Sequence, residues 1–145
     1  MAEQIGLDML LYRNTGTNGS PTWVLIENVG DLTGPDSMDK IELPRRKTAI
    51  KQYEPGQRDI SFEWDMIKDE TDTQFTALRT AYAAKTLTEF AFANGPIATA
   101  GTKYFRVECK IFEFARTEPI NGANAYHVVV APCWSANVPD YVTAP

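Results

Sequence analysis

The sequence predicts an α+β fold dominated by β-strands: an antiparallel β-sandwich or partial barrel with one flanking α-helix. Most apolar runs are short and alternate with polar residues, which is the pattern of half-buried strands. One stretch alone, residues 71–85, repeats its apolar residues at helical spacing. The expected order is two strands, a long connection, a strand, the helix and three more strands, so the single helix flanks a system of antiparallel strands.

Composition narrows the class of protein. The 145 residues correspond to one domain, with 43% hydrophobic and 23% charged residues, which argues against global disorder. The net charge of -5 argues against a protein whose main task is binding nucleic-acid phosphates, since such proteins are normally basic. The first residues lack the basic and apolar regions of a signal peptide, and no apolar run reaches membrane-spanning length. We therefore expect a chain made in a cytoplasm, with no membrane partner.

The N-terminal half begins with a predicted hairpin. Residues 7–13 and 22–28 read as strands, and the Asn, Thr, Gly, Ser and Pro residues between them are typical of a loop. Residues 30–57 then form a long connection between the second and third strands, with several Gly and Pro positions and no sustained period. Connections of this length inside a compact domain are usually functional or disordered.

The clearest strand is predicted over residues 59–66, because its residues alternate strictly between two faces. The apolar face consists of Ile60, Phe62, Trp64 and Met66. The polar face consists of Asp59, Ser61, Glu63 and Asp65. Such a strand lies between a core and water.

The helix over residues 71–85 has recognisable ends. Thr71 and Gln74 fit a capping box, with the side chain at each position bonding the backbone of the other. Asp72 in the first turn and Lys85 in the last turn match the helix dipole. The apolar stripe is expected to pack on the sheet.

Three strands are expected after the helix, over residues 86–93, 104–115 and 125–134. In the second of these, the core face changes phase from Ile111 to Phe112 and Phe114, which indicates a β-bulge. Asn121-Gly122 is a strong hairpin signal before the last strand. Residues 135–145, with two prolines and no period, are expected to form an extended C-terminal arm.

Side chains suited to catalysis are few, so we expect a protein that is not an enzyme and binds no cofactor or metal. The one histidine, His127, lies in mid-strand without a nearby nucleophile. Cys109 and Cys133 do not form a CxxC pair and are expected to be buried free thiols. No phosphate-binding loop or dinucleotide fingerprint is present. The acidic strand face is better explained as a solvated surface than as a catalytic carboxylate pair.

A basic cluster stands out within the long connection of this acidic chain. Arg45, Arg46 and Lys47 are consecutive, with Lys40 and Lys51 nearby. The cluster can be a nucleic-acid patch, plain solvated charge, or a docking element for an acidic surface on another copy. We favour the third interpretation, because a basic projecting loop on an acidic body gives head-to-tail contacts that generate rings or filaments.

The order of these features resembles the major tail tube proteins of siphophages over roughly residues 9–134. A strand containing Trp23 precedes the long connection, which carries Asp39-Lys40-Ile41-Glu42. The motif Tyr53-Glu54-Pro55-Gly56-Gln57-Arg58-Asp59 then resembles the turn that precedes the next strand in that family. A helix beginning near Thr71 and a Phe-rich strand follow.

This resemblance implies a structural role in a virion tail. Six copies would form a ring in which strands from every copy close an inner β-barrel, and rings would stack into a tube through which DNA leaves the capsid. Assembly in the host cytoplasm, with tape-measure, tail-tip and tail-terminator proteins as further partners, is implied as well.

The resemblance and the charge pattern together give two sets of site residues. We expect residues 30–57 at the ring–ring contact, carried by Asp39, Lys40, Glu42, Arg45, Arg46, Lys47 and Lys51. We expect the acidic strand face to line the lumen and keep DNA mobile, through Asp59, Ser61, Glu63 and Asp65. The alternative lumen strand covers residues 104–110, with the mixed charges of Arg106, Glu108 and Lys110.

Other classes remain open from the sequence. A tube protein of a contractile secretion machine and a tail terminator or neck protein that makes a single ring are the nearest. A carbohydrate-binding β-sandwich is more distant and would use exposed aromatic residues such as Trp23, Tyr53 or Tyr141.

Overall fold

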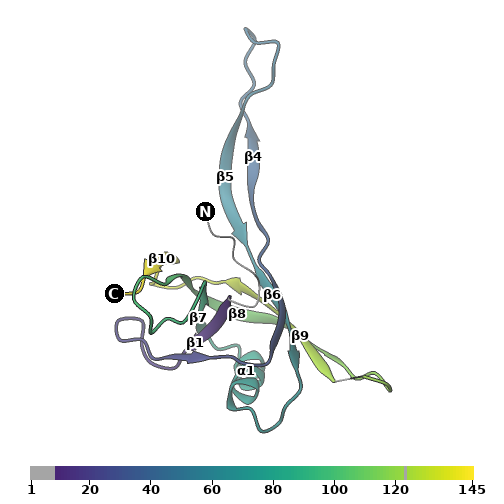
Figure 1. Ribbon diagram of the computed structural model, residues 1–145. Coiled ribbons are helices and arrows are strands. Elements are labelled where there is room, and N and C mark those ends of the chain that lie inside the picture. The colour runs from purple at the N-terminus through teal and green to yellow at the C-terminus, as the bar shows by residue number, and fades with distance from the viewer. Residues whose placement is uncertain (1–8, 123) are drawn as a thin grey trace.

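The computed structural model describes residues 9–122 and 124–145, and its described elements are one helix and ten strands (Figure 1). The strands of the N-terminal half are β1 (Leu10–Asn14), β2 (Trp23–Leu25), β3 (Val29–Thr33), β4 (Asp36–Glu42), β5 (Tyr53–Ile60) and β6 (Phe62–Ile67). The helix α1 (Thr73–Ala84) precedes β7 (Thr88–Ala93), β8 (Lys103–Thr117), β9 (Ala125–Pro132) and β10 (Asp140–Thr143).

The main sheet has the strand order β2-β1-β7-β8-β9-β6-β3, and β10 pairs with β8 beside this path. The strand pairs of the described chain are all antiparallel. Strand β8 connects two parts of the sheet, because its first half pairs with β7 and its second half with β9. The predicted class, mainly β with one helix in the described residues, is confirmed.

The core lies between the sheet and α1. The helix contributes Phe75 and Leu78, which pack against inward residues of β6, β7, β8 and β9 such as Trp64 and Val128. Each of these side chains is almost completely buried, and burying one such side chain stabilises a fold by about 1.5–3 kcal/mol. The alternation predicted for residues 59–66 is confirmed, since Trp64 and Met66 are buried, and Ile60 and Phe62 pack against the core.

The helix starts later than the sequence indicated. Asp72 is the N-cap residue, and its carboxylate accepts a hydrogen bond from the Gln74 amide at 3.0 Å. The capping box expected at Thr71 is wrong, because the Thr71 amide and hydroxyl both donate to Asp69. The Asp69 carboxylate holds Thr71 outside the helix, and the Asp72 carboxylate caps the helix in its place. Lys85 ends the helix with a left-handed backbone, φ 58°.

The long connection expected over residues 30–57 contains strands. Together β3 and β4 run antiparallel to β6 and β5, and the Ser61 amide donates to the Pro35 carbonyl at 3.1 Å where the two pairs join. The outer part, β4 and β5, projects from the body as a two-stranded hairpin (Figure 1). Its side chains are almost all exposed, so neither face carries the apolar alternation by which a strand is recognised in a sequence.

The turn expected at Pro55-Gly56 is likewise wrong, because both residues lie inside β5. Here the β4–β5 register shifts between Met38 and Lys40, which marks a bulge or irregularity. Proline is compatible with this strand because a two-stranded sheet has only edge strands, where a missing amide need not break a ladder. The chain therefore continues outward at these residues, and it reverses at residues 43–52 instead.

The phase change in the strand after residue 104 is confirmed as a register shift between Ile111 and Glu113 on β8. Phe112 is the extra residue and is 61% exposed, so its expected place on the core face is wrong, whereas Phe114 packs against the core. Asn121-Gly122 lies in the β8–β9 connection, residues 118–124, of which residue 123 is outside the described chain.

The C-terminal segment contains a docked strand. Strand β10 pairs with residues 103–106 of β8, and Ala144 is buried. Residues 140–143 of the expected arm, 135–145, thus belong to the sheet. With four residues, β10 is too short to show a period in the sequence, so pairing with a distant strand decides its conformation.

Candidate functional site: an acidic sheet face and a projecting hairpin

The acidic face predicted over residues 59–66 exists as a row along β5 and β6. Glu63 and Asp65 lie on β6, opposite Val129 and His127 of β9. Their β6 neighbours Trp64 and Met66 point into the core, so the carboxylates point away from it. Asp59 belongs to the base of the projecting hairpin, and Ser61 lies at the junction between β5 and β6. The row therefore runs from the main sheet into the hairpin.

His127 belongs to this row, a placement that the sequence analysis missed. Its Nδ1 lies 2.8 Å from Asp65 Oδ1, and its Nε2 lies 3.3 Å from Glu63 Oε2. The hydrogen bond with Asp65 raises the pKa of His127 above its usual value, the partial burial opposes this, and Glu63 adds to the rise. The protonated imidazole thus offsets part of the negative charge of the row.

The acidic face extends to a third strand. Val129 pairs with Glu63 on one side and with Glu113 of β8 on the other, so both carboxylates flank one small apolar residue. Ala115 lies beyond His127 in the same way. Sequence reasoning missed Glu113 because the bulge at Phe112 moves it to this face; the phase change in β8 was the available signal.

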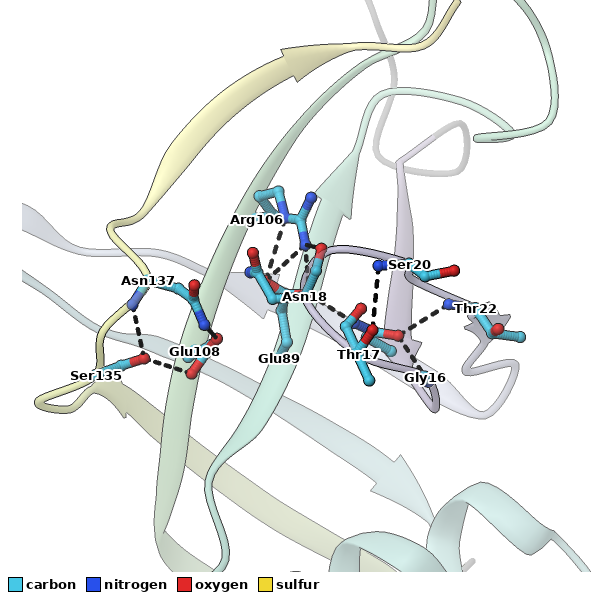
Figure 2. A network of polar contacts seen from close by, with 11 residues as sticks. Gly16, Thr17, Asn18, Ser20, Thr22, Glu89, Arg106, Glu108, Ser135 and Asn137 are labelled. Carbon is cyan, nitrogen blue, oxygen red and sulfur yellow. Dashed lines mark hydrogen bonds and ion pairs between the residues drawn. The ribbon is translucent and has the colours of Figure 1, made fainter.

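On the alternative lumen strand, residues 104–110, the side chains of Arg106 and Glu108 are engaged within the molecule (Figure 2). Arg106 forms an ion pair with Glu89 at 2.8 Å, and Glu108 accepts hydrogen bonds from Ser135 and Asn137. Lys110 is half-buried opposite Ala131. These contacts leave the β6–β9–β8 region as the more open acidic surface.

The residues predicted at the ring–ring contact are distributed along the hairpin. Lys40 and Glu42 lie on one face of β4, and Asp39 lies on the opposite face. The Lys40 ammonium lies 5.5 Å from the Tyr53 ring centroid. The structure brings together Arg45, Arg46, Lys47 and Lys51 in the tip, residues 43–52.

The tip is closed by a hydrogen bond from the Leu43 amide to the Gln52 carbonyl at 2.9 Å. Its ten residues contain four basic and no acidic side chains. At the other end, the hairpin base carries an ion pair between Arg58 and Asp36, which lowers the pKa of Asp36. Positive charge is therefore concentrated at the point farthest from the body.

No group of three or more His, Cys, Asp or Glu side chains in residues 9–122 and 124–145 is arranged to hold a metal ion. Within the same part of the chain, no helix is long and apolar enough to span a membrane.

Comparison with known proteins relates this arrangement to solved assemblies. No family model matches the sequence, and no curated protein matches it. A chain from the tail of an empty gene transfer agent particle has a TM-score of 0.72 at 17% identity, with 97% of this chain and 99% of that chain covered. A chain of the SPP1 tail tube has a TM-score of 0.74 at 11% identity, with 89% and 75% covered.

Contractile assemblies contain the fold as well. A chain of the sheath–tube complex of an extracellular contractile injection system, PVC, has a TM-score of 0.66 at 10% identity, with 97% of this chain and 92% of that chain covered. These likenesses confirm at the level of fold the resemblance seen in the sequence. The chain has the tail-tube fold that phage tails and contractile injection systems share.

Proposed function

We propose that this chain is the repeating structural subunit of a virion tail tube, in which hexameric rings stack head to tail around a lumen that conducts DNA. The likeness to a chain of the gene transfer agent tail, over 97% of this chain, carries the proposal; that assembly is described with C6 symmetry. In this proposal the protein is not an enzyme. It meets tape-measure, tail-tip and tail-terminator proteins at the ends of the tube, and it is assembled in the host cytoplasm.

The projecting hairpin supplies the proposed contact between rings. Strands β4 and β5 pair with no other described strand, and Met38, Ile41 and Tyr53 are exposed along them. An isolated two-stranded hairpin is marginally stable in water, so contact with a neighbouring copy would stabilise it. The basic tip also complements a body whose net charge is negative.

The acidic face supplies the proposed lumen. Glu63 and Asp65 on β6 and Glu113 on β8 point away from the core on the two strands that flank β9, and His127 of β9 contacts Glu63 and Asp65. Negative charge on a pore wall repels phosphates and therefore opposes binding of the DNA that passes. Asp59 and Ser61 would extend this surface toward the next ring.

Two related functions are tested by the same experiment. The tube of a contractile injection system is one, since PVC and the anti-feeding prophage contain the fold, although their TM-scores of 0.64–0.66 are below the 0.71–0.74 of the gene transfer agent and SPP1 chains. A single-ring terminator is the other, because the anti-feeding prophage tube-terminating cap also contains a similar chain.

Negative-stain electron microscopy of the purified protein tests the proposal. Wild-type protein is expected to form long tubes with a central channel, whereas a terminator would stop at single rings. The triple variant R45E/R46E/K47E is expected to remain folded and to form no long tubes. Lys103→Glu, an exposed charge reversal outside the hairpin, is the control and is expected to leave tubes intact. Normal tubes from the triple variant would overturn the role of the hairpin.

The lumen assignment has a direct test. In a cryo-electron microscopy map of the tube, the carboxylates of Glu63, Asp65 and Glu113 should face the channel. A map that places them on the outer wall or between rings overturns this part of the proposal. Channel contents then separate the two tube functions, since DNA is expected in particles from a phage-type tail.

A further inference from the structure

The segment after β9 has an inverted pattern of polarity. Trp134 is 93% exposed and Val138 is 82% exposed, although both are large and apolar. The alternate residues, Ser135 and Asn137, are half-buried and turn their polar groups toward the protein. A segment that faces only water normally has the opposite arrangement, with apolar side chains inward. The outward side of this segment is therefore suited to contact with another protein surface.

Contacts with one carboxylate hold the segment in this conformation (Figure 2). Ser135 Oγ and Asn137 Nδ2 each donate to Glu108 at 2.5 Å. The backbone amide of Asn137 donates to Ser135 Oγ at 3.1 Å, and the backbone amide of Cys133 donates to the backbone carbonyl of Glu108 at 3.3 Å. Because these bonds fix the backbone on both sides of Trp134, the indole is presented before any partner arrives. Preorganised aromatic side chains of this kind dominate binding at protein interfaces.

An apolar recess lies elsewhere on the same chain. It has a volume of about 1020 Å³ and lies between β1, the end of β2 and β3, which are near the two ends of the strand order. Leu10, Leu25, Val29 and Leu32 are among its lining residues. Its lining is mainly apolar, so a large apolar side chain is the kind of group that it would accommodate.

The exposed segment and the recess belong to opposite faces of the sheet. Glu108, which holds the segment, alternates on β8 with Val107 and Cys109, and those two residues point into the core. The recess instead reaches the core side, since Leu11 and Ile26 belong both to its lining and to the core. A projection and a recess on different faces cannot satisfy each other within one copy, but they can do so between copies.

We propose that Trp134 and Val138 insert into the recess at β1, β2 and β3 of a second copy of this chain, as the lateral contact between neighbours in one ring. The inference rests on the proposed assembly and adds to it a second interface, distinct from the hairpin. Such a contact joins two different surfaces and is therefore heterologous, which closes into a ring when the rotation allows. The segment from Trp134 to Val138 carries no charged side chain, so a nucleic acid is not its partner.

Removing the apolar side chains tests the contact. The variant W134S/V138S is expected to keep the wild-type thermal unfolding midpoint, because both side chains are exposed. Sedimentation velocity should show monomers, and negative-stain images should show neither rings nor tubes. Trp134→Phe keeps a large aromatic group and is expected to retain assembly. Rings or tubes formed by W134S/V138S overturn this inference alone, whereas a wild-type chain that stays monomeric overturns the proposed function with it.

A crosslinking experiment identifies the receiving surface. In a Cys133→Ser background, Ala136→Cys, an exposed position between Trp134 and Val138, and Leu32→Cys are made in separate chains, and Cys109 remains buried. Mild oxidation of the mixture is expected to give a disulfide-linked dimer on a non-reducing gel, at least tenfold above the amount from either variant alone. Equal yields from the mixture and from the separate variants overturn the assignment of the recess as the receiving surface.

Discussion

Glu89 and Glu108 lie directly opposite each other on the paired strands β7 and β8. Like charges at opposed positions destabilise a sheet, so each carboxylate requires partners of its own. Glu89 pairs with Arg106 and accepts hydrogen bonds from Asn14 and Asn18. Glu108 accepts from Ser135 and Asn137. Two repelling carboxylates thereby hold two separate loops against one face of the sheet (Figure 2).

Arg106→Ala is expected to lower the free energy of unfolding by about 3 kcal/mol, because it leaves a buried carboxylate without its cation. The Glu89 side chain is only 7% exposed, and Arg106 also lies over the Trp23 ring. Urea denaturation measures the change. The control is Arg116→Ala, which removes an exposed ion pair with Glu118 and should cost less than about 1 kcal/mol. Equal losses in the two variants would contradict the role assigned to Glu89.

Asp72→Ala is expected to cost about 1 kcal/mol of stability, whereas Thr71→Ala should cost clearly less. Asp72 caps the helix and also accepts a hydrogen bond from Asn28 at 2.9 Å, while Thr71 bonds only to Asp69. Chemical denaturation of the two variants decides between the caps. Asn28→Ala measures how much of the Asp72→Ala effect comes from the lost hydrogen bond with Asn28. A larger loss of stability in Thr71→Ala than in Asp72→Ala would support the capping box at Thr71 instead.

His127 should titrate above its usual pKa of 6.5, because Asp65 and Glu63 stabilise the protonated ring. Its contribution to stability is fully present below pH 6.5 and is lost as pH rises through the raised pKa of the folded state. Since the chain has one histidine, NMR of its ring protons gives this pKa without assignment ambiguity. Asp65→Asn is expected to lower it. A pKa of 6.5 or below in the wild-type protein would refute the contact.

The two thiols should differ in reactivity. Burial raises the pKa of Cys109 far above its usual value, so the thiolate needed for reaction is not formed in the folded protein. Cys133 is half-buried. Reaction with a chromogenic disulfide reagent should therefore modify one thiol per folded chain and the second only in denaturant. Cys133→Ser should abolish the early reaction; a remaining early thiol would show that Cys109 is accessible.

Much of the fold could be predicted from the sequence where one side of an element faces the core. Residues 59–66 alternate because Trp64 and Met66 are buried while Glu63 and Asp65 are not. The change of phase before Phe114 predicted the β8 bulge for the same reason. The strands β4 and β5 of the hairpin were not predicted, because both faces of the hairpin are exposed and no periodic burial constrained its side chains.

The sequence alone determined the class of fold, the acidic strand face and the concentration of basic residues within 43–52, since these depend on residue types and short-range periodicity. Tertiary structure decided which distant strands adjoin. Pairing of β6 with β9 places His127 between Asp65 and Glu63, although 62 and 64 positions separate them along the chain. Pairing of β8 with β9 brings Glu113 to the same face. Register between strands far apart in sequence is set by packing of the whole core, which local patterns do not encode.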